Sequence, residues 1–107
     1  VEPIDVHSPE LYGNHVCYHE GARDAFAKCR AWGFVDVFRK HHPEPGHYTF
    51  FDYRTPDAVN KGVGWRIDYL LASPALAEKC TGAAIDLKPR LESKPSDHTV
   101  LMAEFDL

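Results

Sequence analysis

The sequence lacks any apolar run of 18 residues, so no segment is predicted to span a membrane. Positive charge is not in excess either, because 12 Lys and Arg stand against 16 Asp and Glu, for a formal net charge of −4. Net charge therefore argues against general polyanion binding, although a nucleic acid responds to the field of the face it meets and a local basic groove stays open. The 44% hydrophobic and 26% charged residues are typical of a globular protein, and 107 residues leave room for one domain.

Cysteine is scarce, and its spacing fits neither a disulfide framework nor a CxxC motif. Cys17, Cys29 and Cys80 are an odd number of thiols, which favours reduced cysteines and a cytoplasmic location. Internal repeats and low-complexity tracts are also missing. The chain opens Val-Glu-Pro without an initiator methionine, and we expect it to be a fragment of a longer polypeptide.

Hydrophobic spacing predicts one main helix followed by strands. Apolar residues recur at three- and four-residue steps over 20–32, and Gly33 follows where a left-handed residue commonly ends a helix. Residues 34–38 form a short apolar piece, and 74–79 predict one or two helical turns. Strands are predicted from β-prone and apolar runs at 48–53, 65–73, 83–87 and 100–105.

The expected fold class is α+β, with a mostly antiparallel sheet of about four strands. The run Tyr69-Leu70-Leu71-Ala72 is continuously apolar, which is typical of a strand buried on both faces. One helix covers only part of one face. We therefore expect a second layer, supplied by an N-terminal half that this chain lacks.

Two polar stretches are expected to be solvated loops. The first is 1–19, which carries the acidic residues Glu2, Asp5 and Glu10. His15 and His19 within it have the spacing of a zinc-binding pair on a helix, but the stretch has loop composition and no second ligand pair follows. The second stretch is the proline-rich turn after the short apolar piece, which carries His41, His42 and His47.

Two short motifs place carboxylates where hydrolytic chemistry could use them. Asp68 lies in the run Gly64-Trp65-Arg66-Ile67-Asp68-Tyr69, where a lone carboxylate is costly unless it is paired. Asp97 and His98 adjoin each other in Pro95-Ser96-Asp97-His98, on a loop that leads into the last strand. A histidine that gains or loses a proton near neutral pH needs a partner to fix its tautomer. The combination indicates metal-assisted hydrolysis.

Three stretches together resemble the C-terminal half of the exonuclease III family of apurinic/apyrimidinic endonucleases, within the endonuclease/exonuclease/phosphatase superfamily. They are Tyr48–Arg54, Gly64–Ser73 and Lys94–His98, in the family's order and with similar separations. The resemblance covers the whole chain and implies that residues 1–107 form the C-terminal half of one four-layer α/β/β/α sandwich domain.

The activity implied by this resemblance is that of a DNA repair nuclease dependent on Mg²⁺ (or Mn²⁺). It would hydrolyse the phosphodiester 5′ to abasic sites in duplex DNA, with 3′–5′ exonuclease activity as a further property of the family. The family's other metal ligands and catalytic groups lie in its N-terminal half, so the metal site would be completed by residues absent from this chain. The 107 residues alone are therefore expected to be inactive.

The resemblance assigns roles to three motif residues. His98 matches a catalytic histidine that contacts the scissile phosphate, where positioned donors stabilise developing charge. Asp68 matches the aspartate that orients this histidine, and Asp97 matches a metal ligand. Other interpretations stay open, because Asp68 could face solvent on an edge strand and Asp97 could form an Asx turn or a cap.

A substrate pocket is implied for Phe50, Trp65 and Ile67, which match positions that line the family's abasic pocket. A tight aromatic slot admits a flipped-out sugar without its base. Core packing is the competing interpretation, and for Phe51 it is the preferred one. Basic residues near the motifs are candidates for DNA-phosphate contacts, unless they are simply solvated charges: Arg54, Lys61, Arg66, Arg90 and Lys94.

Two other functions stay open on the sequence alone. The Ser96-Asp97-His98 element is shared with other phosphodiesterases and phosphatases of the superfamily, which act on phospholipids or inositol phosphates. The segment could also be a non-catalytic assembly domain, whose uncovered sheet face, with Leu70, associates with a second copy of the chain.

Overall fold

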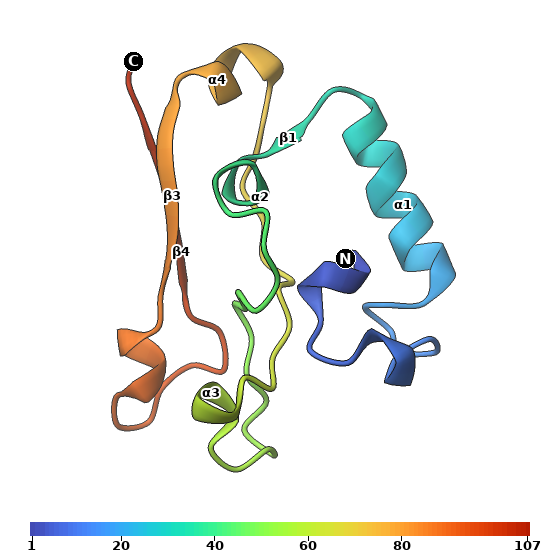
Figure 1. Ribbon diagram of the computed structural model, residues 1–107, viewed down its shortest axis with the longest axis vertical. Coiled ribbons are helices and arrows are strands. Elements are labelled where there is room, and N and C mark those ends of the chain that lie inside the picture. Colours follow the sequence, from blue (N-terminus) through green and yellow to red (C-terminus); the bar gives the residue numbers. More distant parts are fainter.

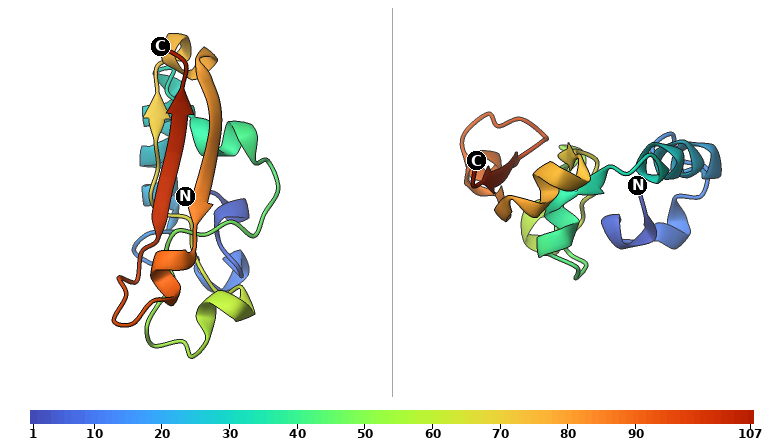
Figure 2. Two further views of the ribbon diagram at one scale, coloured as in Figure 1. Left: turned by 90° about the vertical axis from the view of Figure 1, so that its left-hand side faces the viewer. Right: turned by 90° about the horizontal axis from the view of Figure 1, so that it is seen from above.

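Helix α1 (Glu20–Ala31) and the ribbon of β3 (Cys80–Asp86) and β4 (Val100–Phe105) lie on opposite sides of the molecule, with short elements and irregular chain between them (Figure 1). The computed structural model describes residues 1–107 and measures 41 × 32 × 21 Å, and Figure 2 shows the same separation from above. None of its helices has the length and apolar character needed to cross a membrane.

The mixture of helices and strands confirms the predicted α+β class. The remaining elements are α2 (Val37–His41), α3 (Ala58–Lys61), α4 (Pro74–Glu78), β1 (Val35–Asp36), β2 (Leu71–Ala72) and the 3₁₀ turns η1 (Pro3–Asp5), η2 (Pro9–Leu11) and η3 (Lys88–Leu91).

Local signals explain the ends of the predicted helices. The His19 ring accepts a hydrogen bond from the Ala22 N–H at 3.3 Å and caps α1, and Gly33, with φ of 110°, follows its last turn. In α4, Ser73 caps the N-terminus and Pro74 occupies the first turn, where its missing N–H has no cost.

The sheet differs from the prediction of four strands in one layer. The four strands form two separate antiparallel pairs, β1–β2 and β3–β4. Of the expected strands, 100–105 is present as β4 and 83–87 falls mostly within the longer β3, whereas 65–73 contributes only β2. The short apolar piece at 34–38 holds β1 and the start of α2.

The segment 48–53 was expected to be a strand, but it forms only isolated bridges, from Phe50 to Trp65 and to His98. The N–H groups of Thr49 and Phe50 both donate to the carbonyl of Trp65, at 2.9 Å each, which interrupts a regular ladder. In space, the segment nevertheless lies between the 64–69 motif and the loop of His98, and it bonds to both.

A buried ion network joins three distant parts of the chain. The Arg66 guanidinium donates to Asp5 at 2.7 Å and to both carboxylate oxygens of Asp36, at 2.7 and 3.2 Å. Arg39 pairs with the same Asp5 oxygen, and the Asp36 side chain also accepts from the Arg39 N–H at the start of α2. The network ties η1, α2 and the 64–69 motif together.

This network corrects two expectations. Arg66 was a candidate DNA contact, but its residue is 2% exposed and its charge is neutralised inside the protein, so it is not available to a phosphate in this fold. Asp5 was expected in a solvated loop and is fully buried. Buried charges of this kind are stable only when they are paired and hydrogen-bonded, which is the case for both.

Tyr69 closes one side of the network. Its hydroxyl donates to the Arg66 carbonyl at 2.9 Å, and its ring lies under the guanidinium, 4.8 Å from the ring centroid. Burial and the negative charge of Asp5 raise the pKa of the Tyr69 hydroxyl far above its ordinary value. The hydroxyl therefore stays protonated and remains a hydrogen-bond donor at neutral pH.

The hydrophobic core is thin and divided. Only 16 of the 107 residues are buried, and the buried hydrophobic residues include three small clusters of three or four residues each. One face of β3 packs on α2, while β4 leaves Val100 and Met102 exposed. Phe51 is buried beside Tyr48 and Ala58, as predicted.

We predict that Arg66→Met unfolds or strongly destabilises the chain. The substitution leaves the carboxylates of Asp5 and Asp36 buried, with Arg39 as the only remaining arginine of the network. Removing one partner of a buried ion pair costs about 3–5 kcal/mol of stability. Urea denaturation followed by circular dichroism measures the effect. Arg54→Met is the control, since Arg54 is an exposed arginine whose loss should leave the unfolding midpoint nearly unchanged. Equal stability of the Arg66→Met variant and the parent would show that the network is unimportant.

Candidate functional site

The side chains of Asp68 and His98 meet across 30 residues of sequence. His98 Nδ1 lies 2.7 Å from Asp68 Oδ2, and the two side chains are 42% and 40% exposed. A carboxylate only accepts hydrogen bonds, so Nδ1 carries the proton and donates it. The lone pair, or a second proton, is then at Nε2, on the ring edge away from Asp68. The structure thus brings together the pair that the family resemblance implied.

Thr49 holds the backbone on both sides of this pair. Its buried hydroxyl accepts from the N–H groups of Ile67 and Asp68, at 3.1 and 3.2 Å. Its carbonyl accepts from the Thr99 N–H at 2.8 Å, next to His98. The sequence analysis missed this residue, because a threonine in a β-prone run carries no signal that its hydroxyl replaces a strand partner.

Asp97 lies half-buried beside the pair. Its backbone carbonyl accepts from the Phe51 N–H at 2.8 Å, while its carboxylate makes no hydrogen bond within the chain. The local turn is made instead by Ser96, whose hydroxyl accepts from the His98 N–H at 3.1 Å. The Asp97 carboxylate is therefore free to bind a cation, and Mg²⁺ typically uses one or two protein carboxylates with water and phosphate oxygens.

An aromatic cleft of about 180 Å³ opens near the 64–69 motif. Phe50 and Trp65 line it, and the Phe50 ring also meets the His98 ring edge-on, with centroids 5.3 Å apart. Ile67 does not line the cleft; it packs against the cluster of Val6, Tyr18 and Trp65 behind it. Trp65, 7% exposed, belongs to both the cleft and the core, so the two interpretations of this residue are compatible.

Three residues of the N-terminal loop complete the cleft and were not predicted. The rings of His15 and Tyr12 lie 4.4 and 4.6 Å from the Trp65 ring. His7 Nδ1 donates to the Gly64 carbonyl, and His7 Nε2 accepts from the Tyr12 hydroxyl, at 3.0 Å each. A loop without periodicity gives no sequence signal that it folds back onto a motif 50 residues away.

The other basic residues predicted to contact DNA phosphates lie in different environments. The side chain of Arg54 is 89% exposed at the cleft and pairs with Asp52, whose pKa the Arg54 hydrogen bonds lower to about 2. Lys61 lies in the last turn of α3 and does not line the cleft. Arg90 donates to the Phe51 carbonyl at 2.9 Å, which gives it a structural role in holding the loop. Lys94 is exposed on the loop before the Asp97 motif.

The fold and this site define a class of protein. The family model described as Endonuclease/Exonuclease/phosphatase family matches residues 7–98, and the chain belongs to that family. The matched region contains the cleft, the Asp68–His98 pair and Asp97.

Individual relatives confirm the exonuclease III resemblance. Exodeoxyribonuclease III of Haemophilus influenzae is 40% identical over 84 residues, which are 71% of this chain and 31% of that protein. The structure of an AP endonuclease from Archaeoglobus fulgidus is 57% identical with a TM-score of 0.97, over 99% of this chain and 41% of that one. A 3′ phosphatase from Neisseria, solved with a product DNA hairpin, is 35% identical with a TM-score of 0.92, over 99% and 41%. The chain thus spans about a third of the curated relatives and two fifths of these structures.

We predict that Asp68→Asn changes the tautomer of His98. The amide can donate as well as accept, so the preference for a proton on Nδ1 is lost. ¹⁵N chemical shifts of the imidazole nitrogens measure the tautomer directly. Asp52→Asn is the matched control, because this carboxylate pairs with Arg54 and does not touch His98. A His98 spectrum unchanged in the Asp68→Asn variant would show that the hydrogen bond does not control the ring.

Proposed function

We propose that this chain is the C-terminal portion of a metal-dependent DNA repair nuclease that hydrolyses the phosphodiester 5′ to an abasic site. The observation that carries the proposal is the 2.7 Å hydrogen bond between Asp68 and His98, next to a cleft lined by Phe50 and Trp65. Family membership supports phosphoester hydrolysis, and the relatives named as AP endonuclease and exodeoxyribonuclease support DNA as the substrate.

In this proposal, Asp68 holds His98 so that Nε2 points to the scissile phosphate. A ring held in one orientation offers a hydrogen bond to the oxygens that gain charge during hydrolysis, without reorganising at that moment. Phe50 contacts the His98 ring edge and limits its rotation. The aromatic cleft would accept the sugar that lacks a base and exclude an intact nucleotide.

Asp97 would supply one ligand to Mg²⁺ or Mn²⁺. Its unpaired carboxylate is a hard oxygen donor, which suits either ion. The ion, when bound, would neutralise charge on the phosphate and lower the pKa of a bound water. A single carboxylate is too few ligands for a complete site, and the remaining ones would come from an N-terminal half.

The thin core supports the proposal that this chain is part of a larger domain. With 16 of 107 residues buried and Val100 and Met102 exposed along β4, an additional layer would cover apolar surface. Self-association of two copies through this face is the alternative arrangement. The three cysteines are free thiols, which fits the proposed cytoplasmic location.

Complementation tests the function. The N-terminal half of the Archaeoglobus AP endonuclease is added to this chain, and the substrate is a duplex with one tetrahydrofuran lesion. We expect Mg²⁺-dependent cleavage on the 5′ side of the lesion for the mixture and none for either half alone. In the mixture, His98→Asn should lower the rate by at least about 100-fold, and Asp68→Asn by about 10–100-fold.

The matched control for this experiment is His19→Asn, which replaces an exposed histidine and keeps a residue that caps α1. It should cleave like the parent. Full cleavage by the His98→Asn mixture would contradict the proposed catalytic role. A folded mixture that ignores the lesion but hydrolyses a phospholipid or inositol phosphate would favour the other superfamily chemistries.

A second candidate activity is removal of nucleotides or phosphate at DNA 3′ ends. It is favoured by the relatives named exodeoxyribonuclease III and 3′ phosphatase. The same mixture, given a recessed duplex end with and without a 3′ phosphate, separates this activity from cleavage at the lesion.

A further inference from the structure

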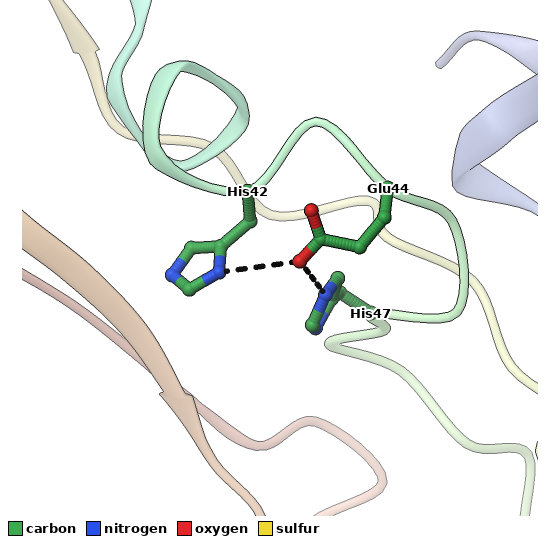
Figure 3. A group of neighbouring side chains, drawn as sticks. All are labelled: His42, Glu44 and His47. Carbon is green, nitrogen blue, oxygen red and sulfur yellow. Dashed lines mark hydrogen bonds and ion pairs between the residues drawn. The ribbon is translucent and has the colours of Figure 1, made fainter.

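Three side chains with metal-binding atoms meet in the turn after α2, outside the candidate active site. His42, Glu44 and His47 each offer one ligand atom, and these atoms all lie within 4.8 Å of one another. Figure 3 shows both imidazoles directed at the same carboxylate oxygen. Glu44 Oε1 lies 3.6 Å from His42 Nδ1 and 2.9 Å from His47 Nε2. None of the three lines the cleft that holds Phe50 and Trp65.

The ring of His42 is already held in a metal-binding orientation. Its Nε2 lies 2.6 Å from the Ala83 carbonyl in β3, to which it must donate. The proton is therefore on Nε2, and the Nδ1 lone pair faces Glu44. The Phe38 ring stacks on the face of the His42 ring, with centroids 4.6 Å apart. Metal-bound histidines commonly donate their second nitrogen to a backbone carbonyl in this way.

Arg39 holds the turn that carries the other ligands. Its Nη1 donates to the carbonyls of His42 and Glu44, at 2.9 and 2.8 Å. Gly46, with φ of 92°, takes a backbone conformation that allows the chain to reverse toward His47. The positive charge of Arg39 would oppose a cation, but it is paired with the buried Asp5. The backbone that carries His42 and Glu44 is therefore held in place before any ion binds.

The distances suit a tetrahedral ion after small side-chain movements. Ligand atoms on a tetrahedral Zn²⁺ lie about 3.4 Å apart for bonds of about 2.1 Å. The Glu44 oxygen lies 2.9 and 3.6 Å from the two imidazole nitrogens, and all three ligand atoms lie within 4.8 Å of one another. The Nε2–H of His47 donates to Glu44 Oε1, so this proton is released when Nε2 binds an ion. The side chains are one-third to one-half exposed, which leaves an open position for water.

We propose that His42, Glu44 and His47 form a binding site for Zn²⁺ that is separate from the candidate active site. Two imidazoles and one carboxylate are a ligand set that Zn²⁺ uses with water in the fourth position. Mg²⁺ prefers oxygen ligands and octahedral geometry, so it does not compete well here. Because His42 also donates a hydrogen bond to the Ala83 carbonyl, bound Zn²⁺ would fix the 42–47 turn against β3.

The test is a titration of the 107-residue chain with Zn²⁺ against a chromophoric chelator. Cys17 and Cys29 are replaced by serine in every variant, because these thiols are not buried and bind zinc themselves. We expect one Zn²⁺ per chain, unaffected by millimolar Mg²⁺. His42→Asn, Glu44→Gln and His47→Asn should each weaken binding by at least about 10-fold, since even the loss of an outer partner has that effect.

His19→Asn is the matched control and should bind Zn²⁺ like the parent. A second readout is ¹⁵N NMR, in which Zn²⁺ should shift His42 Nδ1 and His47 Nε2 and leave the His19 ring unchanged. Zn²⁺ should also raise the Tm of the parent and not of the three site variants, because an ion bound only to the folded state stabilises it. Absence of binding, or binding that all three site substitutions leave intact, would overturn the proposal.

Discussion

The buried pairing of Arg66 with Asp5 and Asp36 is the interaction on which the rest of the structure depends. It brings the N-terminal turn, the start of α2 and the 64–69 motif to one point. The chain has few buried apolar residues to do this by packing, so charge and hydrogen bonding define which segments meet. Such a network is strongly sensitive to losing one partner, because the others are left charged and buried.

The candidate site depends on this arrangement at short range. Arg66 lies between Trp65 and Ile67, and its N–H also donates to the Asp5 carbonyl at 2.7 Å. The backbone of the motif is thus held on one side by the network and on the other by Thr49. Asp68, next in the motif, is placed where it reaches His98. A charge network and a single buried hydroxyl therefore position a pair that is itself half exposed.

The two metal sites that we propose differ in their chemistry. Asp97 offers a lone carboxylate beside the His98 imidazole, which in the proposed function would suit a hard ion shared with substrate oxygens. The turn of His42, Glu44 and His47 offers imidazole nitrogens, which suit Zn²⁺. Arg39 connects the second environment to the buried network, because it binds Asp5 at one end of its guanidinium and the turn's carbonyls at the other. Zn²⁺ bound at the turn would therefore also stabilise the buried network through Arg39.

The sequence by itself determined the elements that follow from local periodicity and capping. Helix 20–32 is present as α1, strand 100–105 as β4 and the turns at 74–79 as α4. The motif residues identified by resemblance include the pair that meets in the structure, Asp68 and His98. Only the tertiary structure decided that Asp5 and Arg66 are buried and that His42 and His47 share a carboxylate. The physical reason is that a charged or polar side chain has the same local signal whether it meets water or a distant partner, and which of these it meets depends on the folded chain.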